Sequence, residues 1–428
     1  MLYYYLKKIL EVMSLKNDNI YKTIVFTLVF LIIIVSCAIV SMLIFNYNDI
    51  RKFNKTESEA FYSSGDHSTE EITFPYSKLT AYKPTEQNVR PIGRTVYNDD
   101  VLWFSMSGCG AEFNCSGVYA EIKLCVYNSQ YITYNHRPRI AVFSDDVLVL
   151  DMVLEEDEQT LMVELDPFSE NTVIKIIKLS ESMYSSVGIS EISVFSDKQI
   201  SPTDGDKLKI EFIGDSITCG YGLDEESSYA AFSTRTENFA KTYAYLASNA
   251  VNAECYAVAF SGYGVLSGFT SNGVIQDEYV IKNRYDKAVT GMNFDDDYLY
   301  EWSFQKYQPD IVVINLGTND ASYCSTKERR ERFCEEYQNL LIQIRENNPQ
   351  AFIICILGDM NNSLYPSIKQ SASDYVLNYN DYRISCTTIA FEMGTYGSTI
   401  DGHPNIDSNI LAAQTFEQYL KEHILDIL

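Results

Sequence analysis

Residues 208–222 read LKIEFIGDSITCGYG, a short apolar run followed directly by a turn that carries a serine. An apolar run of this length, closed by glycine, is typical of a strand buried in a sheet. Similar runs recur in the C-terminal half, at 253–259, 310–316, 351–357 and 383–389. Segments with helical character alternate with them, at 238–250, 328–347, 367–379 and 407–427. This alternation predicts a parallel sheet wrapped by helices, an α/β domain, over residues 207–428.

Blocks of glycine and polar residues stand at the ends of three predicted strands and before the last helix. The blocks are Gly214–Thr218, Ser261–Gly264, Gly317–Asp320 and Asp401–Pro404. In an open parallel sheet, ligands bind beyond the carboxyl ends of the strands. One such block alone is an ordinary turn, but four at one edge of a sheet predict a functional site.

In chain order, the blocks place a Ser, a Gly, an Asn and a His, and this order resembles the SGNH (GDSL-type) hydrolase superfamily. Four stretches are also similar to carbohydrate esterase family 2. They are IGRTVYNDDVLWFSMSG (92–108), GDSITCGYG (214–222), FSGYGV (260–265) and WSFQKYQPDIVVINLGTND (302–320). The resemblance covers about residues 88–428. It implies a jelly-roll domain ahead of an SGNH domain, and removal of O-acetyl groups from xylan, glucomannan or oligosaccharides derived from them.

The residue types in the blocks suit acyl transfer. A serine hydroxyl is a poor nucleophile until a base accepts its proton. Of the four histidines, His67, His136, His403 and His423, only His403 lies in a loop at the predicted strand ends. We therefore predict Ser216 as the nucleophile and His403 as its general base. Taken singly, the two would be an ordinary helix N-cap and a surface histidine.

The resemblance also implies which groups bind the oxyanion of the intermediate. They are the backbone N–H groups of Ser216 and Gly262 and the side-chain amide of Asn319. Glycine lets the backbone approach an oxygen closely, and the asparagine amide is an uncharged N–H donor. No metal or organic cofactor is needed for this chemistry. The sequence contains no CxxC pair that would indicate a zinc site, and most of its ten cysteines are predicted to be buried free thiols.

The third member of a catalytic triad departs from the superfamily pattern. There, an acid stands three residues before the histidine, where this chain has Ile400; Asp401 stands two residues before it. Some relatives in carbohydrate esterase family 2 use a Ser–His dyad in which a backbone carbonyl orients the imidazole. Two alternatives therefore stay open: Asp401, or a main-chain carbonyl, orients Nδ1 of His403.

Other side chains in and near the blocks have structural or binding interpretations. Asp215 and Asp320 are predicted to accept backbone N–H groups and so hold their loops. Tyr263 and Trp302 are candidate platforms for the substrate, because aromatic faces stack on pyranose rings. Either aromatic residue would serve equally well as part of the core.

Residues 74–198 have a different pattern, with short runs rich in Val, Ile, Tyr and Phe between turn residues. The runs are 101–106, 117–127, 139–143, 146–153, 160–165, 172–179 and 187–195. Regular short strands without helical periods predict a β-sandwich, for which the family resemblance implies a jelly-roll. The segment SDKQISPTDGDK (196–207) then links this domain to the α/β domain.

Residues 24–45 read IVFTLVFLIIIVSCAIVSMLIF and carry no charge. The segment is long enough to span a bilayer of about 30 Å as a helix, so we predict a single-pass transmembrane anchor at 23–45. Four lysines precede it, and the bulk of the chain follows it. Both favour a cytoplasmic N-terminus at 1–22 and an extracytoplasmic catalytic domain on a polar stalk at 46–73. A lipoprotein cleavage box that ends at Cys37 is the alternative.

The formal net charge of -25 disfavours nucleic acid as a partner, because phosphate backbones would be repelled. The partner that the resemblance implies is an acetylated carbohydrate. Two competing functions stay open: a lipid or thioester hydrolase of the same superfamily, and a carbohydrate-binding protein whose hydrolase domain is inactive. The presence of all four block residues argues against the second of these.

Overall fold

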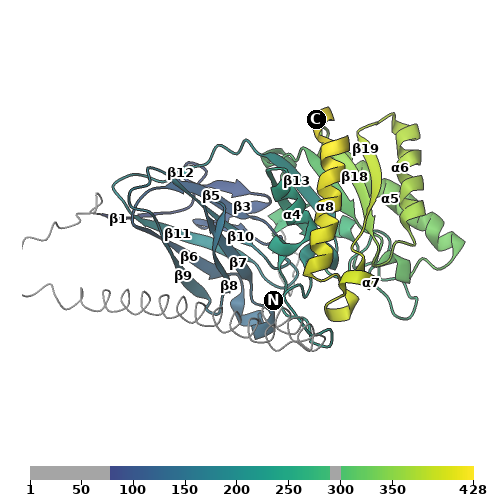
Figure 1. Ribbon diagram of the computed structural model, residues 1–428, viewed down its shortest axis with the longest axis horizontal. Coiled ribbons are helices and arrows are strands. Elements are labelled where there is room, and N and C mark those ends of the chain that lie inside the picture. The colour runs from purple at the N-terminus through teal and green to yellow at the C-terminus, as the bar shows by residue number, and fades with distance from the viewer. Residues whose placement is uncertain (1–77, 290–299) are drawn as a thin grey trace, which may run out of the picture. The chain divides into compact units, whose positions relative to one another are not determined.

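The computed structural model describes residues 78–289 and 300–428, which form a β-rich domain and an α/β domain (Figure 1). The predicted segments 1–22, 23–45 and 46–73 lie outside the described residues. In the part of the chain that is described, no helix is long and apolar enough to cross a membrane. The membrane anchor therefore stays a prediction from the sequence.

The β-rich domain contains two sheets whose strands all pair antiparallel. The first has the order β3-β4-β11-β6-β9 with β1 paired to β11, and its strands are β1 (Leu79–Tyr82), β3 (Thr95–Asn98), β4 (Val101–Phe104), β6 (Tyr119–Val126), β9 (Glu158–Glu164) and β11 (Val187–Phe195). The second has the order β12-β5-β10-β7-β8 with β2 paired to β5, and its strands are β2 (Arg90–Ile92), β5 (Gly110–Cys115), β7 (Arg139–Ser144), β8 (Val147–Val153), β10 (Thr172–Lys178) and β12 (Ser201–Pro202). Apolar side chains of both sheets, such as Ile122 and Ile174, are fully buried in one core. The two sheets thus pack as a β-sandwich does, and the jelly-roll topology stays a prediction.

All seven strands that the sequence predicts in this region are present, and β11 has the predicted bounds. The sequence does not predict β1, β2, β3, β5 and β12. Two of these, β2 and β12, are only two or three residues long and contain a proline. The residues of β5, GAEFNC, include no β-branched side chain, so the composition typical of a strand is missing there.

The α/β domain is built on a five-stranded parallel sheet with the order β14-β13-β17-β18-β19. Its strands are β13 (Leu208–Gly214), β14 (Ala253–Ala259), β17 (Ile311–Asn315), β18 (Phe352–Gly358) and β19 (Ile384–Ile389). Every residue of β17 and β18 is buried, as expected for strands covered on both faces. From β13 the chain first adds β14 on one side and later β17 on the other. The strand order therefore reverses beside β13, where such sheets bind their ligands.

Helices cover both faces of this parallel sheet (Figure 1). The helices are α3 (Ser216–Cys219), α4 (Tyr243–Ala250), α5 (Lys327–Asn347), α6 (Tyr365–Tyr379), α7 (Met393–Tyr396) and α8 (Ile406–His423). Helices α4 and α8 pack together on one face, and α5 and α6 pack together on the other. The helix predicted at 238–250 begins later, because Thr242 is extended and caps α4 by accepting the N–H of Tyr245. A small antiparallel pair, β15 (Lys287–Val289) and β16 (Tyr300–Glu301), completes the fold.

The β-sandwich and the α/β domain share a buried junction. Arg94, in the turn before β3, is fully buried, and its guanidinium donates to the carboxylate of Glu211 in β13 at 3.0 Å. Arg90 donates to Glu112 of its own domain and to Glu254 in β14, each at 2.6 Å. Because a buried charge is tolerated only when it is paired, these contacts fix the two domains to each other.

The cysteines among the described residues are all free, and six of the nine are buried. Cys355 in β18 and Cys386 in β19 stand opposite each other in the sheet and both are thiols. The prediction that most cysteines are buried free thiols is confirmed for these residues.

Candidate active site

Ser216 is the first residue of α3, directly after β13 and one linking residue. That residue, Asp215, caps the helix: its Oδ1 accepts the N–H of Ile217 at 3.0 Å. Gly220 ends the helix after one turn with a φ of 85°, a left-handed conformation that glycine adopts without strain. This tight strand–turn–helix places Ser216 at the carboxyl edge of the sheet, with 7% of its surface exposed.

His403 approaches Ser216 from the loop before α8. Its Nε2 lies 2.7 Å from Oγ of Ser216, and its Nδ1 lies 2.9 Å from the main-chain carbonyl oxygen of Ile400. A carbonyl oxygen only accepts hydrogen bonds, so Nδ1 carries the proton and Nε2 is left to accept the serine proton. This is the tautomer that a general base acting on Ser216 requires.

Burial sets the charge of this imidazole. Removal from water lowers the pKa of His403 below its usual value of 6.5, and the Ile400 carbonyl and the charge of Asp401 oppose this effect only in part. The imidazole is therefore neutral at neutral pH, which is the form that takes up a proton.

The geometry corrects the catalytic role considered for Asp401, because this carboxylate does not orient the imidazole of His403. The oxygen at Nδ1 belongs to the main chain of Ile400, the residue at the superfamily's acid position. Asp401 is exposed, with a φ of 51°, and its Oδ2 accepts the hydroxyl proton of Tyr221 at 3.0 Å. The sequence left open whether Asp401 or a main-chain carbonyl orients Nδ1 of His403, and in the structure the main-chain carbonyl of Ile400 does so.

Tyr221 lies against the imidazole and begins a column of stacked rings. Its ring centroid is 4.4 Å from that of His403, with 27° between the planes. The column continues through Phe232 at 4.4 Å, Tyr184 at a further 5.1 Å and His136 at a further 4.4 Å. Tyr184 and His136 belong to the β-sandwich. The sequence does not reveal this contact between domains, because no periodicity relates residues so far apart in the chain.

Asp401→Asn is expected to lower kcat on an aryl acetate by less than about tenfold, whereas loss of an orienting triad carboxylate costs about 10⁴-fold. The reason is that the Ile400 carbonyl still holds Nδ1 of His403, and the asparagine oxygen still accepts the Tyr221 hydroxyl proton. Steady-state kinetics distinguish the two roles. Tyr221→Phe, which removes the hydrogen bond itself but keeps the Asp401 carboxylate, is the matched control. A loss of about 10³-fold or more in Asp401→Asn would assign the triad role to this carboxylate after all.

The register of the sheet brings the predicted oxyanion residues to the same edge. The last residues of β13 pair with those of β14 and β17, so the loops that carry Ser216, Gly262 and Asn319 emerge side by side. Gly262 has a φ of 81°, and a Cβ built on it would meet nothing within 4 Å, so this loop borders open space. Among the described residues, no protein acceptor takes the N–H of Ser216 or of Gly262. Both are therefore available to an oxyanion.

The amide of Asn319 lies between the serine turn and the glycine loop. Its Nδ2 donates to the main-chain carbonyl of Tyr263 at 2.9 Å and to Oδ2 of Asp215 at 3.2 Å. Both N–H bonds of this amide are engaged here. Donation to an oxyanion therefore requires the exchange of one of them, and the longer bond, to Asp215, is the weaker of the two.

Residues 212–384 match the model of the GDSL-like Lipase/Acylhydrolase family. The α/β domain thus matches the SGNH-type hydrolases. Among curated proteins, the chain is 29% identical over 282 residues to a cellulase/esterase of Acetivibrio thermocellus, a match that covers 61% of this chain but 33%, about a third, of that protein's length. It is 22% identical over 369 residues to an acetylxylan esterase / glucomannan deacetylase of Cellvibrio japonicus, covering 85% of this chain and 96% of that one.

Solved structures show the same fold. An acetyl xylan esterase from the rumen bacterium Butyrivibrio proteoclasticus superposes with a TM-score of 0.70 at 20% identity, covering 81% of this chain and 98% of that one. The match includes the β-sandwich as well as the hydrolase domain, since the hydrolase domain alone is about half of the chain. A family two carbohydrate esterase from Cellvibrio japonicus also superposes, with a TM-score of 0.67 at 20% identity, covering 80% of this chain and 98% of that one. Together these relatives confirm the resemblance to carbohydrate esterase family 2 and to carboxylic-ester hydrolases.

The hydrolase domain uses Asp320 as a structural carboxylate, as the sequence predicts. Its oxygens accept the N–H groups of Val265 at 3.0 Å, Leu266 at 2.7 Å and Ser267 at 3.0 Å. Burial raises the pKa of Asp320 to about 6, although these N–H groups favour the ionised form. Asp320 thus fixes the far end of the loop that begins at Ser261.

Both candidate substrate platforms are buried, which fits their alternative interpretation as part of the core. Tyr263 is 4% exposed, and its ring packs in the core against Phe260. Trp302 is 7% exposed and lies at the domain junction, where the guanidinium carbon of Arg94 is 5.8 Å from its ring centroid. Tyr263 stands inside a block and Trp302 in the stretch that leads to one, and the sequence does not tell whether such a large aromatic ring faces the core or the solvent.

Proposed function

We propose that this chain is a serine esterase that removes O-acetyl groups from carbohydrates through an acyl-enzyme on Ser216. The observation that carries the proposal is the hydrogen bond of 2.7 Å between Oγ of Ser216 and Nε2 of His403, whose Nδ1 is held by a carbonyl oxygen. A buried serine paired with a neutral, oriented imidazole is an activated nucleophile.

The reaction proceeds in two steps at this pair. Oγ of Ser216 bonds to the acetyl carbonyl carbon while Nε2 of His403 takes its proton. The resulting oxyanion is stabilised by the N–H groups of Ser216 and Gly262 and, after exchange, by the amide of Asn319. The C–O bond to the sugar then breaks, and the sugar oxygen receives the proton from His403. In the second step the oxygen of a water molecule bonds to the acetyl carbon while Nε2 of His403 takes a proton from it. The bond between that carbon and Oγ of Ser216 then breaks, Oγ takes the proton back from Nε2, and acetate leaves.

The carbohydrate part of the proposal is supported by the relatives and by one surface residue. The names of the curated relatives describe acetylxylan, glucomannan and cellulose as their substrates. Phe269 is 62% exposed, and its N–H donates to the carbonyl oxygen of Gly262 at 2.9 Å. Phe269 therefore adjoins the loop that carries Gly262 (residues 261–267, the oxyanion loop). Its exposed ring is a candidate apolar surface for the C–H face of a sugar.

Acetate release by the full chain in mild detergent tests this proposal. The substrates are acetylated xylan and acetylated glucomannan, with the same glycans after chemical deacetylation as blanks. Release from an acetylated glycan, absent with the blank, is the expected result. Turnover of long-chain acyl esters without glycan deacetylation would instead support the lipid or thioester hydrolase. Binding of either glycan without any turnover would leave the inactive carbohydrate-binding protein.

We also propose that residues 24–45 anchor the chain in the cell membrane with the hydrolase domain on the extracytoplasmic side. The length and lack of charge of that segment support this arrangement. After alkaline carbonate extraction the chain is expected to stay with membranes, and external protease is expected to cleave it on intact spheroplasts. The length of the mature chain discriminates between the two anchors: a helix anchor leaves the parent chain and Cys37→Ala equally long, whereas lipoprotein cleavage before Cys37 shortens the parent chain but not Cys37→Ala.

A further inference from the structure

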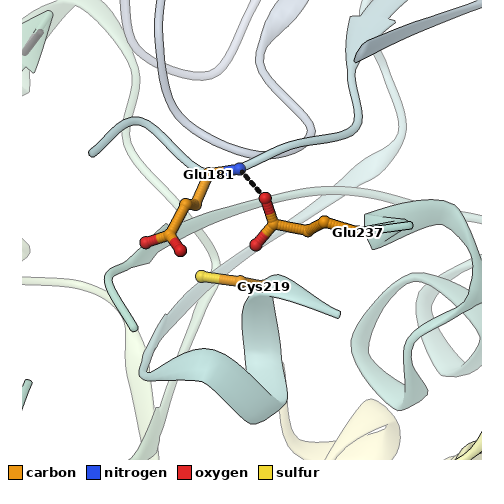
Figure 2. A group of neighbouring side chains, drawn as sticks. All are labelled: Glu181, Cys219 and Glu237. Carbon is orange, nitrogen blue, oxygen red and sulfur yellow. Dashed lines mark hydrogen bonds between the residues drawn. The ribbon is translucent and has the colours of Figure 1, made fainter. Parts of the chain in front are cut away.

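A group of buried ionisable side chains lies where the β-sandwich meets the hydrolase domain. Lys178 and Glu181 come from β10 and the segment that follows it, while Cys219 and Glu237 come from the hydrolase domain. All four are 0% exposed. Figure 2 shows that the carboxylates of Glu181 and Glu237 both face the sulfur of Cys219. None of these side chains has a part in the reaction described above.

Two hydrogen bonds in series lead from Glu237 through Glu181 to the oxyanion loop. Oε2 of Glu237 accepts the main-chain N–H of Glu181 at 2.9 Å, the bond drawn in Figure 2. Oε2 of Glu181 in turn accepts the main-chain N–H of Ser261 at 2.8 Å. Ser261 directly precedes Gly262, so a carboxylate from the β-sandwich holds the residue next to an oxyanion donor.

The arrangement is costly, which argues that it does more than fill space. Oε1 of Glu181 and Oε1 of Glu237 have no hydrogen-bond partner among the described residues. Burial raises the pKa of Glu181 to about 7, and the hydrogen bonds from Ser261 and then the charge of Lys178 oppose this shift. Burial and the charge of Glu181 raise the pKa of Glu237 well above its usual value, and the N–H of Glu181 and then Lys178 oppose that shift. Apolar side chains of similar volume often stabilise a protein as well as buried charges or better. Packing alone therefore does not require these carboxylates.

We propose that Glu181 is a positioning residue of the oxyanion hole, which fixes the direction of the Gly262 N–H by holding the N–H of Ser261. The inference rests on the proposed function. Gly262 has a φ of 81° and no side chain to limit its rotation, so its peptide needs external anchors. Asp320 anchors the loop after Gly262, at residues 265–267, and Glu181 anchors it before Gly262. One anchor comes from each domain.

This role predicts a particular kinetic signature. Negative charge develops on the acyl oxygen only as the tetrahedral intermediate forms, so a misdirected Gly262 N–H weakens the transition state and not substrate binding. Loss of the Glu181 anchor should therefore lower kcat and leave KM nearly unchanged. A purely structural role would lower the melting temperature without this split.

The experiment compares three substitutions at Glu181 in the full chain. In Glu181→Met the side chain is similar in length but cannot accept the hydrogen bond from the Ser261 N–H. This variant is expected to lower kcat roughly 10- to 100-fold and to keep KM within about twofold of the parent value. Glu181→Gln, whose Oε1 still accepts the Ser261 N–H, is expected to stay within about threefold of the parent. Glu181→Asp keeps the charge but shortens the reach, so it should lose kcat as Glu181→Met does. It gives the same test if the methionine variant does not fold.

Glu112→Met is the matched control, because it also removes a buried carboxylate of the β-sandwich. Arg90, the partner of Glu112, still pairs with Glu254 in this variant. The melting temperature is therefore expected to fall somewhat, and kcat is expected to stay unchanged. A second readout is the rate at which a fluorophosphonate labels Ser216, since the phosphonyl oxygen uses the same oxyanion donors. That rate should fall in parallel with kcat.

The outcomes separate this inference from the proposed function. An unchanged kcat and labelling rate in Glu181→Met and Glu181→Asp would overturn the positioning role, as would an equal loss in Glu181→Gln. If the parent chain deacetylates no glycan but still reacts with the fluorophosphonate, the proposed function fails while the labelling rates still decide the role of Glu181.

Discussion

Ser216→Ala is expected to lower kcat for deacetylation by roughly 10⁴- to 10⁶-fold. The variant removes the hydroxyl that is bonded to Nε2 of His403, so water must attack the acetyl carbon without a nucleophile held in place by the enzyme. KM should change little, because the hydroxyl contributes mainly to the transition state. Acetate release under substrate saturation, with the concentration of folded chain checked by circular dichroism, measures the effect.

His403→Ala and the double variant extend this test. The two residues act as one unit, so His403→Ala should match Ser216→Ala within about tenfold, and the double variant should lose no more than either. Ser373→Ala changes an exposed serine on α6 and should be indistinguishable from the parent. If Ser216→Ala retained more than about 1% of kcat, the acyl-enzyme mechanism would have to be abandoned.

Much of the fold can be predicted from the sequence because buried strands appear in it as runs of apolar residues. The run at 310–316 becomes β17 (Ile311–Asn315), and the run at 253–259 is β14 without a change of bounds. Helix ends are set by single capping contacts that periodicity does not contain. The predicted helix at 407–427, for example, ends at His423 and is followed by a short 3-10 turn.

The site is predictable to the extent that it depends on strand ends. The alternation of strands and helices predicts both β13, which Ser216 follows, and α8, which His403 precedes. The positions of these two elements bring Ser216 and His403 together. The contacts of the Ile400 carbonyl and of the Glu181 carboxylate could not be predicted in this way. In the first a main-chain carbonyl of a loop is the acceptor, and in the second a main-chain N–H of a loop is the donor. The direction of a main-chain carbonyl or N–H depends on local φ and ψ, which residue identity specifies poorly outside glycine and proline.

Arg94→Met is expected to lower the free energy of unfolding by about 3–5 kcal/mol, because it leaves a carboxylate buried without its counter-charge. The exposed fractions of the Arg94 and Glu211 side chains are 0% and 1%, so water cannot replace the lost partner. The guanidinium also donates to the main-chain carbonyl of Lys287 at 3.1 Å and to that of Tyr285, and both lose a donor. Urea unfolding, followed by tryptophan fluorescence and by circular dichroism, measures the change.

Two further variants show whether the cost comes from the unpaired charge. Arg94→Met combined with Glu211→Leu removes both charges and should recover part of the loss, since a buried ion pair is often replaceable by apolar groups. Recovery should be incomplete, because the hydroxyls of Tyr256 and Tyr285 then lose their acceptor. Lys421→Met breaks an exposed pair on α8 and should cost less than about 1 kcal/mol.

The activity of these variants separates the junction from the site. Glu211 lies midway along β13, and the residues that bear on the reaction lie beyond the end of that strand at Gly214. Folded Arg94→Met should therefore keep the parent kcat at temperatures well below its melting point. A fall in kcat larger than about tenfold in the folded variant would mean that the Arg94–Glu211 contact, like that of Glu181 with Ser261, transmits the position of the β-sandwich to the oxyanion loop.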